Sequence, residues 1–188
     1  MIFYPNILKF IKITLIWLIF LGFEHSFAAV DPYFRENFTV IMRENKDGLI
    51  ERFQDWSIYK VKRFDKTICY MLSIPIEKKG DKFRRAESYF LVSDLINDAN
   101  EIMVSSGFYY KKNSDIEISF GPKKFYLFSH ESRGWAYDKN DDIDLIKEMQ
   151  KNEEFVITSF SDAGKIAIDK YSLIGFRQAY FKLKEICK

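Results

Sequence analysis

Histidine and cysteine are scarce in this sequence, with two of each among 188 residues. His25 belongs to an N-terminal leader described below, so His130 is the one histidine in the remainder, and no C-x-x-C pair occurs. Structural zinc sites need about four such ligands close together. Phosphate-binding glycine loops, nucleophile elbows and metalloprotease helices are also missing. We therefore expect no metal, no cofactor and no catalytic residues.

One cluster of residue types used by hydrolases is present, because Glu131 and Ser132 follow His130. Adjacent side chains on a strand or turn point apart, whereas a catalytic triad needs convergent side chains. A cysteine hydrolase would need a free thiol beside the histidine. A hydrolase of unknown type that uses His130 stays open as an alternative.

An excess of charge of one sign is also absent. The chain has 29 Lys and Arg against 27 Asp and Glu, a net charge of +2. Without residues 1–28, which include two lysines and one glutamate, the balance is 27 against 26. A nearly neutral domain has no overall field that would attract nucleic acid or anionic lipid. We expect neither as a partner.

Long apolar runs are missing except for one, Ile13 to Phe23, which follows Lys9 and Lys12 and precedes Ser26-Phe27-Ala28. A basic start, a short apolar stretch and small residues before a cleavage point are typical of a secretory signal peptide. The run is shorter than the roughly 20 residues of a spanning helix. We expect residues 1–28 to be removed and no transmembrane segment to remain, with an uncleaved anchor as the alternative.

Export places both cysteines, Cys69 and Cys187, in an oxidising compartment, where two thiols are expected to pair. We expect the periplasm, or beyond it the outer surface or the medium. The chain-entropy account of a disulfide that closes a loop of this length gives a stabilisation of about 4–5 kcal/mol.

Residues 29–52 are polar and charged and are predicted to be a poorly ordered lead-in, with a short strand at 38–42. From residue 53 to 188 we expect a single domain in which short stretches alternate between apolar and polar residues. Regularly spaced short strands with turn signals favour a mostly β fold, a β-sandwich or a barrel-like antiparallel sheet. The predicted strands are 56–61, 68–74, 89–92, 101–109, 116–120, 125–127, 133–137, 156–160 and 165–171.

Two segments have helical spacing instead. Asp141-Asp142 is predicted to cap a helix in which Ile143, Ile146 and Met149 recur. The C-terminal segment from Ser172 has an apolar stripe at intervals of three and four residues, which predicts a helix packed on the sheet. This stripe, which would direct the last cysteine inward toward the strand of Cys69, consists of Leu173, Phe176, Tyr180, Leu183 and Cys187.

A charged stretch from Glu77 to Glu87 interrupts the strand pattern. Its cations could hold an acidic surface or a phosphate, and we take them as the candidate partner-binding residues. The alternative is a solvated loop without a binding role. These candidates are Lys78, Lys79, Lys82, Arg84 and Arg85.

An ordered set of short motifs from about residue 53 to the C-terminus resembles the invasion-associated locus B (IalB) family of exported proteins of Gram-negative bacteria. The match depends on the order and spacing of all the motifs together. They are Asp55-Trp56-Ser57, Ile68-Cys69-Tyr70, Ser73-Ile74-Pro75, Arg84-Arg85, Tyr89-Phe90-Leu91-Val92, Asn100-Glu101-Ile102, Gly107-Phe108, Phe125-Tyr126-Leu127-Phe128, Gly134-Trp135-Ala136, Asp169 through Phe176, and Cys187.

The resemblance implies a mostly β protein of the periplasm or outer surface, associated with entry into host cells and without an established catalytic activity or cofactor. Cys69 and Cys187 match the family's cysteines and would carry over as the disulfide. Two departures stand out: the extra cysteine of many relatives is missing at Tyr59-Lys60-Val61, and Gly164-Lys165 replaces a usual Gly-Thr pair.

From the residues and the resemblance together we expect an exported, non-enzymatic interaction protein linked to host-cell invasion. Its partner would be a protein, an envelope component or a host cell surface, and the sequence does not predict an oligomeric state. The first alternative is a periplasmic housekeeping module that binds an envelope component or assists folding. The second is the hydrolase that uses His130.

Overall fold

The computed structural model describes residues 48–63, 66–95 and 99–187. Its strands form one antiparallel sheet in the order β1-β2-β3-β5-β6-β9-β8-β7-β10-β11-β4. The elements are β1 (Leu49–Phe53), β2 (Trp56–Arg63), β3 (Lys66–Ser73), β4 (Glu77–Gly80), β5 (Tyr89–Leu95), β6 (Ala99–Ser105), β7 (Ile116–Phe120), β8 (Lys123–His130), β9 (Arg133–Trp135), α2 (Lys139–Met149), β10 (Glu154–Phe160), β11 (Ile166–Ser172) and α3 (Phe176–Ile186).

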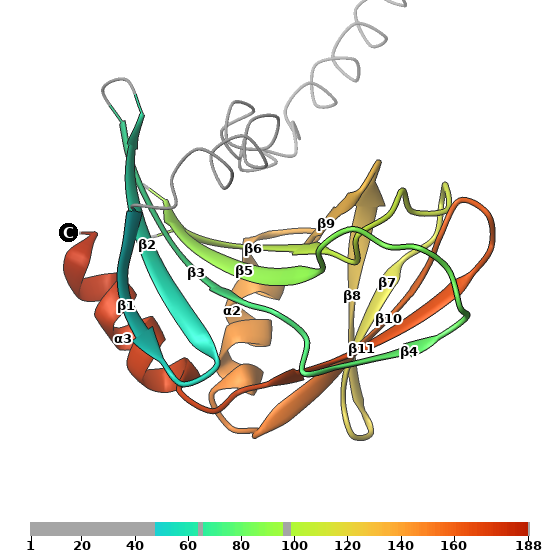
Figure 1. Cartoon of the computed structure of the whole chain (residues 1–188). Helices are drawn as coiled ribbons and strands as arrows, with labels where there is room; N and C mark the ends of the chain where they lie inside the picture. Colours follow the sequence, from blue (N-terminus) through green and yellow to red (C-terminus); the bar gives the residue numbers. More distant parts are fainter. Residues whose placement is uncertain (1–47, 64–65, 96–98, 188) are drawn as a thin grey trace, which may run out of the picture.

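The sheet bends so that its two halves face each other (Figure 1). β8 makes the connection, because residues 123–127 pair with β7 whereas residues 128–130 pair with β9. At the far end, Trp56 Nε1 on β2 donates to the Ser172 carbonyl at the end of β11 over 3.1 Å. Over the described residues, the mostly β, antiparallel fold with two helices is confirmed.

The core between the halves is rich in aromatic rings. Phe90 on β5 meets Trp56, Phe155 and Tyr171 edge-on, with ring centroids 6.2, 4.9 and 6.1 Å away. Edge-to-face aromatic pairs add about 0.5–1.5 kcal/mol each beyond the area they bury. Both helices contribute to this inner cluster, α2 through Leu145, Ile146 and Met149 and α3 through Phe176, Ala179 and Leu183.

The N-terminus of α2 differs from the prediction. Asp138, not Asp141, is the N-cap, and its side chain accepts from the backbone N–H groups of Asn140 at 2.7 Å and Asp141 at 3.1 Å. Asp138 has the extended backbone of an N-cap, with φ −150°. Asp141 and Asp142 are instead in the first helical turn, where negative charge favours the helix dipole.

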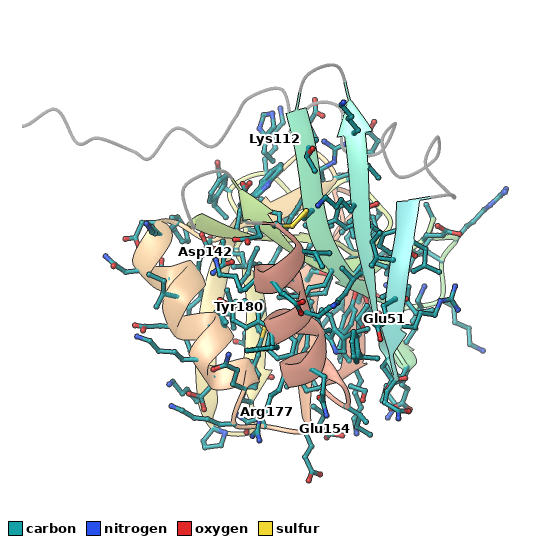
Figure 2. All side chains as sticks on the ribbon, turned by 90° about the vertical axis from the view of Figure 1, so that its left-hand side faces the viewer. Glu51, Lys112, Asp142, Glu154, Arg177 and Tyr180 are labelled. Atoms are coloured by element: carbon teal, nitrogen blue, oxygen red, sulfur yellow. A yellow bond between two sulfur atoms is a disulfide. The ribbon has the colours of Figure 1, made fainter. Side chains whose placement is uncertain are left out.

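The C-terminal helix packs on the sheet as predicted, although it begins at Phe176, after Gly175, so that Leu173 precedes it. Cys187 at its end forms a disulfide with Cys69 on β3, across a sequence separation of 118. Figure 2 shows this bond in yellow. Because the last turn of α3 is joined covalently to β3, the predicted link between helix and sheet is confirmed.

Two strands lie where the sequence analysis placed irregular chain. β1 covers the last residues of the predicted lead-in, and β4 begins the charged stretch that was read as a loop. Both were missed because neither alternates between apolar and polar residues; each is placed in the sheet by pairing with its neighbour, β1 with β2 and β4 with β11. The signal peptide at 1–28 and the predicted strand at 38–42 lie outside the described residues.

No helix in the described ranges is both long enough and apolar enough to cross a membrane.

Candidate functional site

The sheet ends at β4, which pairs only with β11 in the order of the strands. Residues 77–80 face residues 167–170 of β11, and all four of them are exposed. Within the described part of the chain, the other side of β4 carries no strand. An open edge presents unpaired backbone donors and acceptors, and extended segments of other chains can add to it.

Two hydrogen bonds fix the C-terminal end of β4 against β11. The backbone N–H of Asp81 donates to the Ile166 carbonyl at 2.9 Å, and the Asp81 carboxylate accepts from the Ile166 N–H at 3.0 Å. Gly80 has φ +107°, and a Cβ there would lie 2.4 Å from the Ile166 carbonyl oxygen. Only glycine allows this approach, so the end of β4 is specified by Gly80-Asp81.

Four of the five predicted partner-binding cations lie on or directly after this edge. Lys78 and Lys79 belong to β4, and Lys82 and Arg84 follow it, all of them exposed. Lys79 also forms a surface ion pair with Glu77 at 2.8 Å. We call residues 74–84 the β4 edge.

Two isoleucines add apolar surface to the β4 edge. Ile74 and Ile76 flank Pro75 and are 63% and 56% exposed. The sequence analysis named Ile74 only as the end of a strand and as part of a motif, and took neither isoleucine as a binding residue. The signal available for both was their position on either side of Pro75, which ends the strand. The edge therefore combines an open backbone, positive charge and apolar side chains, a combination suited to an extended acidic segment with apolar side chains.

Arg85, the fifth candidate, points inward. Its guanidinium donates to the Ser106 carbonyl at 3.0 Å, to Ser88 Oγ at 2.9 Å and to the carboxylate of Asp169. The side chains of Arg85 and Asp169 are only 10% and 1% exposed. Burial raises the pKa of Asp169, while the hydrogen bond and charge of Arg85 lower it. Arg85 thus holds the end of the β4 edge to the core and is not available to a partner.

A buried polar network continues from Arg85 into the core. Tyr110 Oη donates to Ser106 Oγ at 3.0 Å and accepts from the Ser106 N–H at 2.8 Å, and Ser159 Oγ lies 3.0 Å from Ser106 Oγ. Burial raises the pKa of Tyr110, which therefore remains a neutral phenol. The network ties the chain after β6 to β10 through Ser159 and to the chain before β5 through Ser88 and Arg85.

The one described histidine, His130, lies on the exposed β8–β9 hairpin, where its backbone pairs with Arg133. The structure does not bring Glu131 or Ser132 into a hydrogen bond with its ring. The hydrolase alternative gains no support from this geometry.

A shallow surface pocket of about 370 Å³ lies between β8 and the start of α2. Its polar groups are tied to neighbours: Tyr137 Oη donates to Asp115 at 2.6 Å, and Lys124 pairs with Glu117 at 2.9 Å. Since Tyr137 and Lys124 already bind neighbouring carboxylates, the pocket is a weaker candidate than the β4 edge. It is lined by Lys124, Phe125, Tyr126, Leu127, Tyr137, Asp141 and Leu145.

Asp142 is the described carboxyl group with the most clearly raised pKa. Burial raises that pKa to about 7, and the charge of nearby Glu101 adds to the effect. The carboxylate accepts from the Ile102 N–H at 2.9 Å, which ties α2 to β6. Among the described residues, no group of three or more His, Cys, Asp or Glu is placed to hold a metal ion. Asp142 is thus a contact between helix and sheet.

No family model matches this sequence, and no curated protein does either. A solved structure is similar, the crystal structure of invasion associated protein B from Bartonella henselae. The match has a TM-score of 0.53 and 14% sequence identity, and covers 72% of this chain and 95% of that one. At this identity the likeness shows a shared fold, in agreement with the fold that the IalB resemblance implies.

Proposed function

We propose that this chain is an exported, non-enzymatic interaction domain that binds a protein partner at the β4 edge and contributes to association with host cells. The observation behind the proposal is the open edge itself, where an exposed strand combines Lys78 and Lys79 with Ile74 and Ile76. Extended peptides gain main-chain hydrogen bonds at such an edge, and neighbouring side chains supply specificity.

Three further points support this proposal. The disulfide between Cys69 and Cys187 suits an oxidising compartment outside the cytoplasm. The fold resembles that of a protein whose name associates it with invasion. The residue types of a hydrolase are not assembled around His130.

Location is tested first, by protease shaving of intact cells followed by fractionation and intact-mass measurement. Digestion from outside, with a mass that lacks residues 1–28, supports a surface role. Protection until the outer membrane is opened contradicts host-cell contact and favours the periplasmic housekeeping module.

Binding is tested with purified mature protein on cultured host cells. The variant Lys78→Glu/Lys79→Glu reverses two adjacent charges on β4, and Lys111→Glu/Lys112→Glu makes the same change at two exposed lysines between β6 and β7. Figure 2 labels Lys112. We expect binding to fall about tenfold in the β4 variant only, since charge complementarity steers association. Equal binding by both variants contradicts the role of the β4 edge.

A catalytic role is tested by His130→Ala. We expect this variant to keep every phenotype of the unaltered chain. Loss of a phenotype in a folded His130→Ala protein contradicts the non-enzymatic proposal.

A further inference from the structure

The half of the sheet that contains β4 has a face that points away from the core. Its strands are β8, β7, β10, β11 and β4, neighbours in this order, and Figure 1 shows them together on the right. Side chains alternate between the two faces of a strand. On β10, Phe155, Ile157 and Ser159 are buried, whereas Val156 and Thr158 point the other way and remain partly exposed. The outward side chains of this half therefore reach the surface.

Strand pairing aligns these outward side chains in two rows that run from β8 to β4. In each row, every residue is the pairing partner of the next. The first row consists of Tyr126, Glu117, Thr158, Ile168 and Lys79. The second row consists of Lys124, Ser119, Val156, Lys170 and Glu77. None of the residues in the two rows is buried. We call the two rows the outer face.

The charges of the outer face are balanced within the chain. Its lysines all pair with glutamates, Lys124 with Glu117 at 2.9 Å, Lys79 with Glu77 at 2.8 Å and Lys170 with Glu154 at 2.6 Å. A surface without excess charge does not attract nucleic acid or anionic lipid. The centre of the face, at Val156, Thr158 and Ile168, is apolar or only weakly polar. The surface that fits it therefore carries charges of both signs around an apolar centre of its own.

A second copy of this chain has such a surface. A two-fold axis that runs along β10 brings the same row of both copies together, with β8 opposite the other copy's β4 and β7 opposite its β11. The one facing pair of two charged residues is attractive, a lysine faces a tyrosine ring as in a cation–π contact, and no like charges face each other. The facing residues, one from each copy, are Lys124 and Glu77, Tyr126 and Lys79, Ser119 and Lys170, Glu117 and Ile168, Val156 and Val156, and Thr158 and Thr158.

We propose that two copies of this chain associate through the outer face, about a two-fold axis that runs along β10. Sheets that pack face to face in this way lie ~10 Å apart, with their strands within about 30° of each other. Five strands at ~4.8 Å and the length of β10 at ~3.4 Å per residue give a face of roughly 500 Å² on each chain. A standard interface buries about 800 Å² per partner, so we expect a weak, reversible dimer.

This inference goes beyond the proposed function and does not rest on it. Glu77 and Lys79 belong to the outer face and also to the β4 edge. Self-association is therefore measured on the purified mature protein without host cells, by sedimentation equilibrium at concentrations up to about 1 mM. Host-cell binding and dimer formation are separate readouts, so either proposal can fail while the other stands.

Charge reversal tests whether Lys124 faces Glu77 of the second copy. In Lys124→Glu or in Glu77→Lys, like charges would face each other twice, once on each side of the two-fold axis. We expect the dissociation constant of each variant to rise about tenfold or more. An equimolar mixture of the two variants should dimerise as well as the unaltered chain, because the two reversed charges then face each other on one side of the axis and the native pair remains on the other.

The matched control is Lys123→Glu, the same reversal at the neighbouring residue, whose side chain pairs with Glu148 of α2 and lies outside the outer face. It should dimerise as the unaltered chain does. A protein that stays monomeric up to about 1 mM overturns the proposal. Equal weakening by Lys123→Glu and Lys124→Glu overturns it as well, and so does a mixture of folded variants that does not recover the dimer.

A crosslink keeps the proposal falsifiable if a charge variant unfolds. Val156 lies on the proposed axis and faces itself, so a cysteine there should form a disulfide between two copies. Phe181→Cys is the control, at an α3 side chain that is 75% exposed. Under mild oxidation we expect Val156→Cys to form linked dimers about tenfold faster than Phe181→Cys. Equal rates overturn the proposal, since collisions of unassociated chains would explain both.

Discussion

The two edge strands of the sheet, β1 and β4, differ in what lies beside them. Beside β1, the Gly175 turn that opens α3 comes so close to the Phe53 carbonyl that a Cβ on Gly175 would lie 2.0 Å from its oxygen. The far end of α3 is bonded to β3 by the disulfide. β4 has only β11 as a partner, and all of its residues are exposed. β1 is thus packed against the turn that opens α3, a helix that the disulfide holds on β3, whereas β4 is held in the sheet through β11.

Because of this difference, we expect the residues that stabilise the domain and the residues that bind a partner to be different ones. Substitutions at the β1 side and at the buried anchor of the β4 edge should change the free energy of unfolding. Substitutions of the exposed cations on β4 should change binding and leave stability unaltered. The predictions below test this separation, from the largest expected effect on stability to the smallest.

The largest effect is expected at the anchor of the β4 edge. Arg85→Ala leaves the carboxylate of Asp169 buried without its cation, and breaking a buried pair in this way costs about 3–5 kcal/mol. Arg84→Ala is the matched control at an adjacent, exposed arginine. Chemical denaturation measures both variants. If the two lose the same stability, Arg85 is not an anchor.

The next largest effect is expected for Cys187→Ser, which removes the bond between α3 and β3. Loss of a native disulfide in a small secreted domain costs about 2–5 kcal/mol. Cys69→Ser should lose the same amount, and the double variant should lose no more than either, because all three remove one bond. Two free thiols in the unaltered mature protein, detected by mass after alkylation, would contradict the prediction.

A smaller effect is expected at the turn before α3. Gly175 has φ +89°, and forcing another residue into this region costs about 1–3 kcal/mol, to which the contact with Phe53 adds. Gly164→Ala is the control, since Gly164 has φ +74° but nothing within 4 Å of an added Cβ. Thermal unfolding should show a larger loss for Gly175→Ala. Equal losses would mean that the close approach to β1 contributes nothing.

The smallest effect is expected on β4 itself. Lys78→Glu/Lys79→Glu alters exposed side chains, and such substitutions change stability by less than about 0.5 kcal/mol. The same variant should lose host-cell binding. Unfolding curves measured on the sample used for the binding assay keep the two results comparable. A large loss of stability would remove the contrast between the two edges.

Much of the fold was predictable because it depends on local patterns. The alternation of apolar and polar residues located β2, β3, β5, β7, β8, β10 and β11 within a few residues. The stripe that ends at Cys187 predicted both α3 and the side that it presents to the sheet. In contrast, β1 and β4 lack such a pattern, since hydrogen bonds to a neighbouring strand hold an edge even where no side chain is buried.

The candidate site was predictable only in part. Five cations in one stretch predicted a basic surface, but the separation of Arg85 from Arg84 depends on Asp169, which is 84 positions away in the sequence. The N-cap of α2 shows the same limit on a small scale. Asp138, Asp141 and Asp142 are all residues that could cap a helix, and only the backbone angles in the folded chain identify Asp138 as the N-cap.

The sequence by itself predicted the mostly β class, the C-terminal helix and the cysteine pair, which the structure has. It also predicted the export signal, which lies outside the described residues. These follow from composition and from periodicity, which are properties of neighbouring residues. Only the tertiary structure decided that β1 and β4 form the two edges of the sheet and which arginine is buried. Those outcomes depend on the pairing of strands far apart in the chain, because burial and charge pairing are set by what the fold places next to each residue.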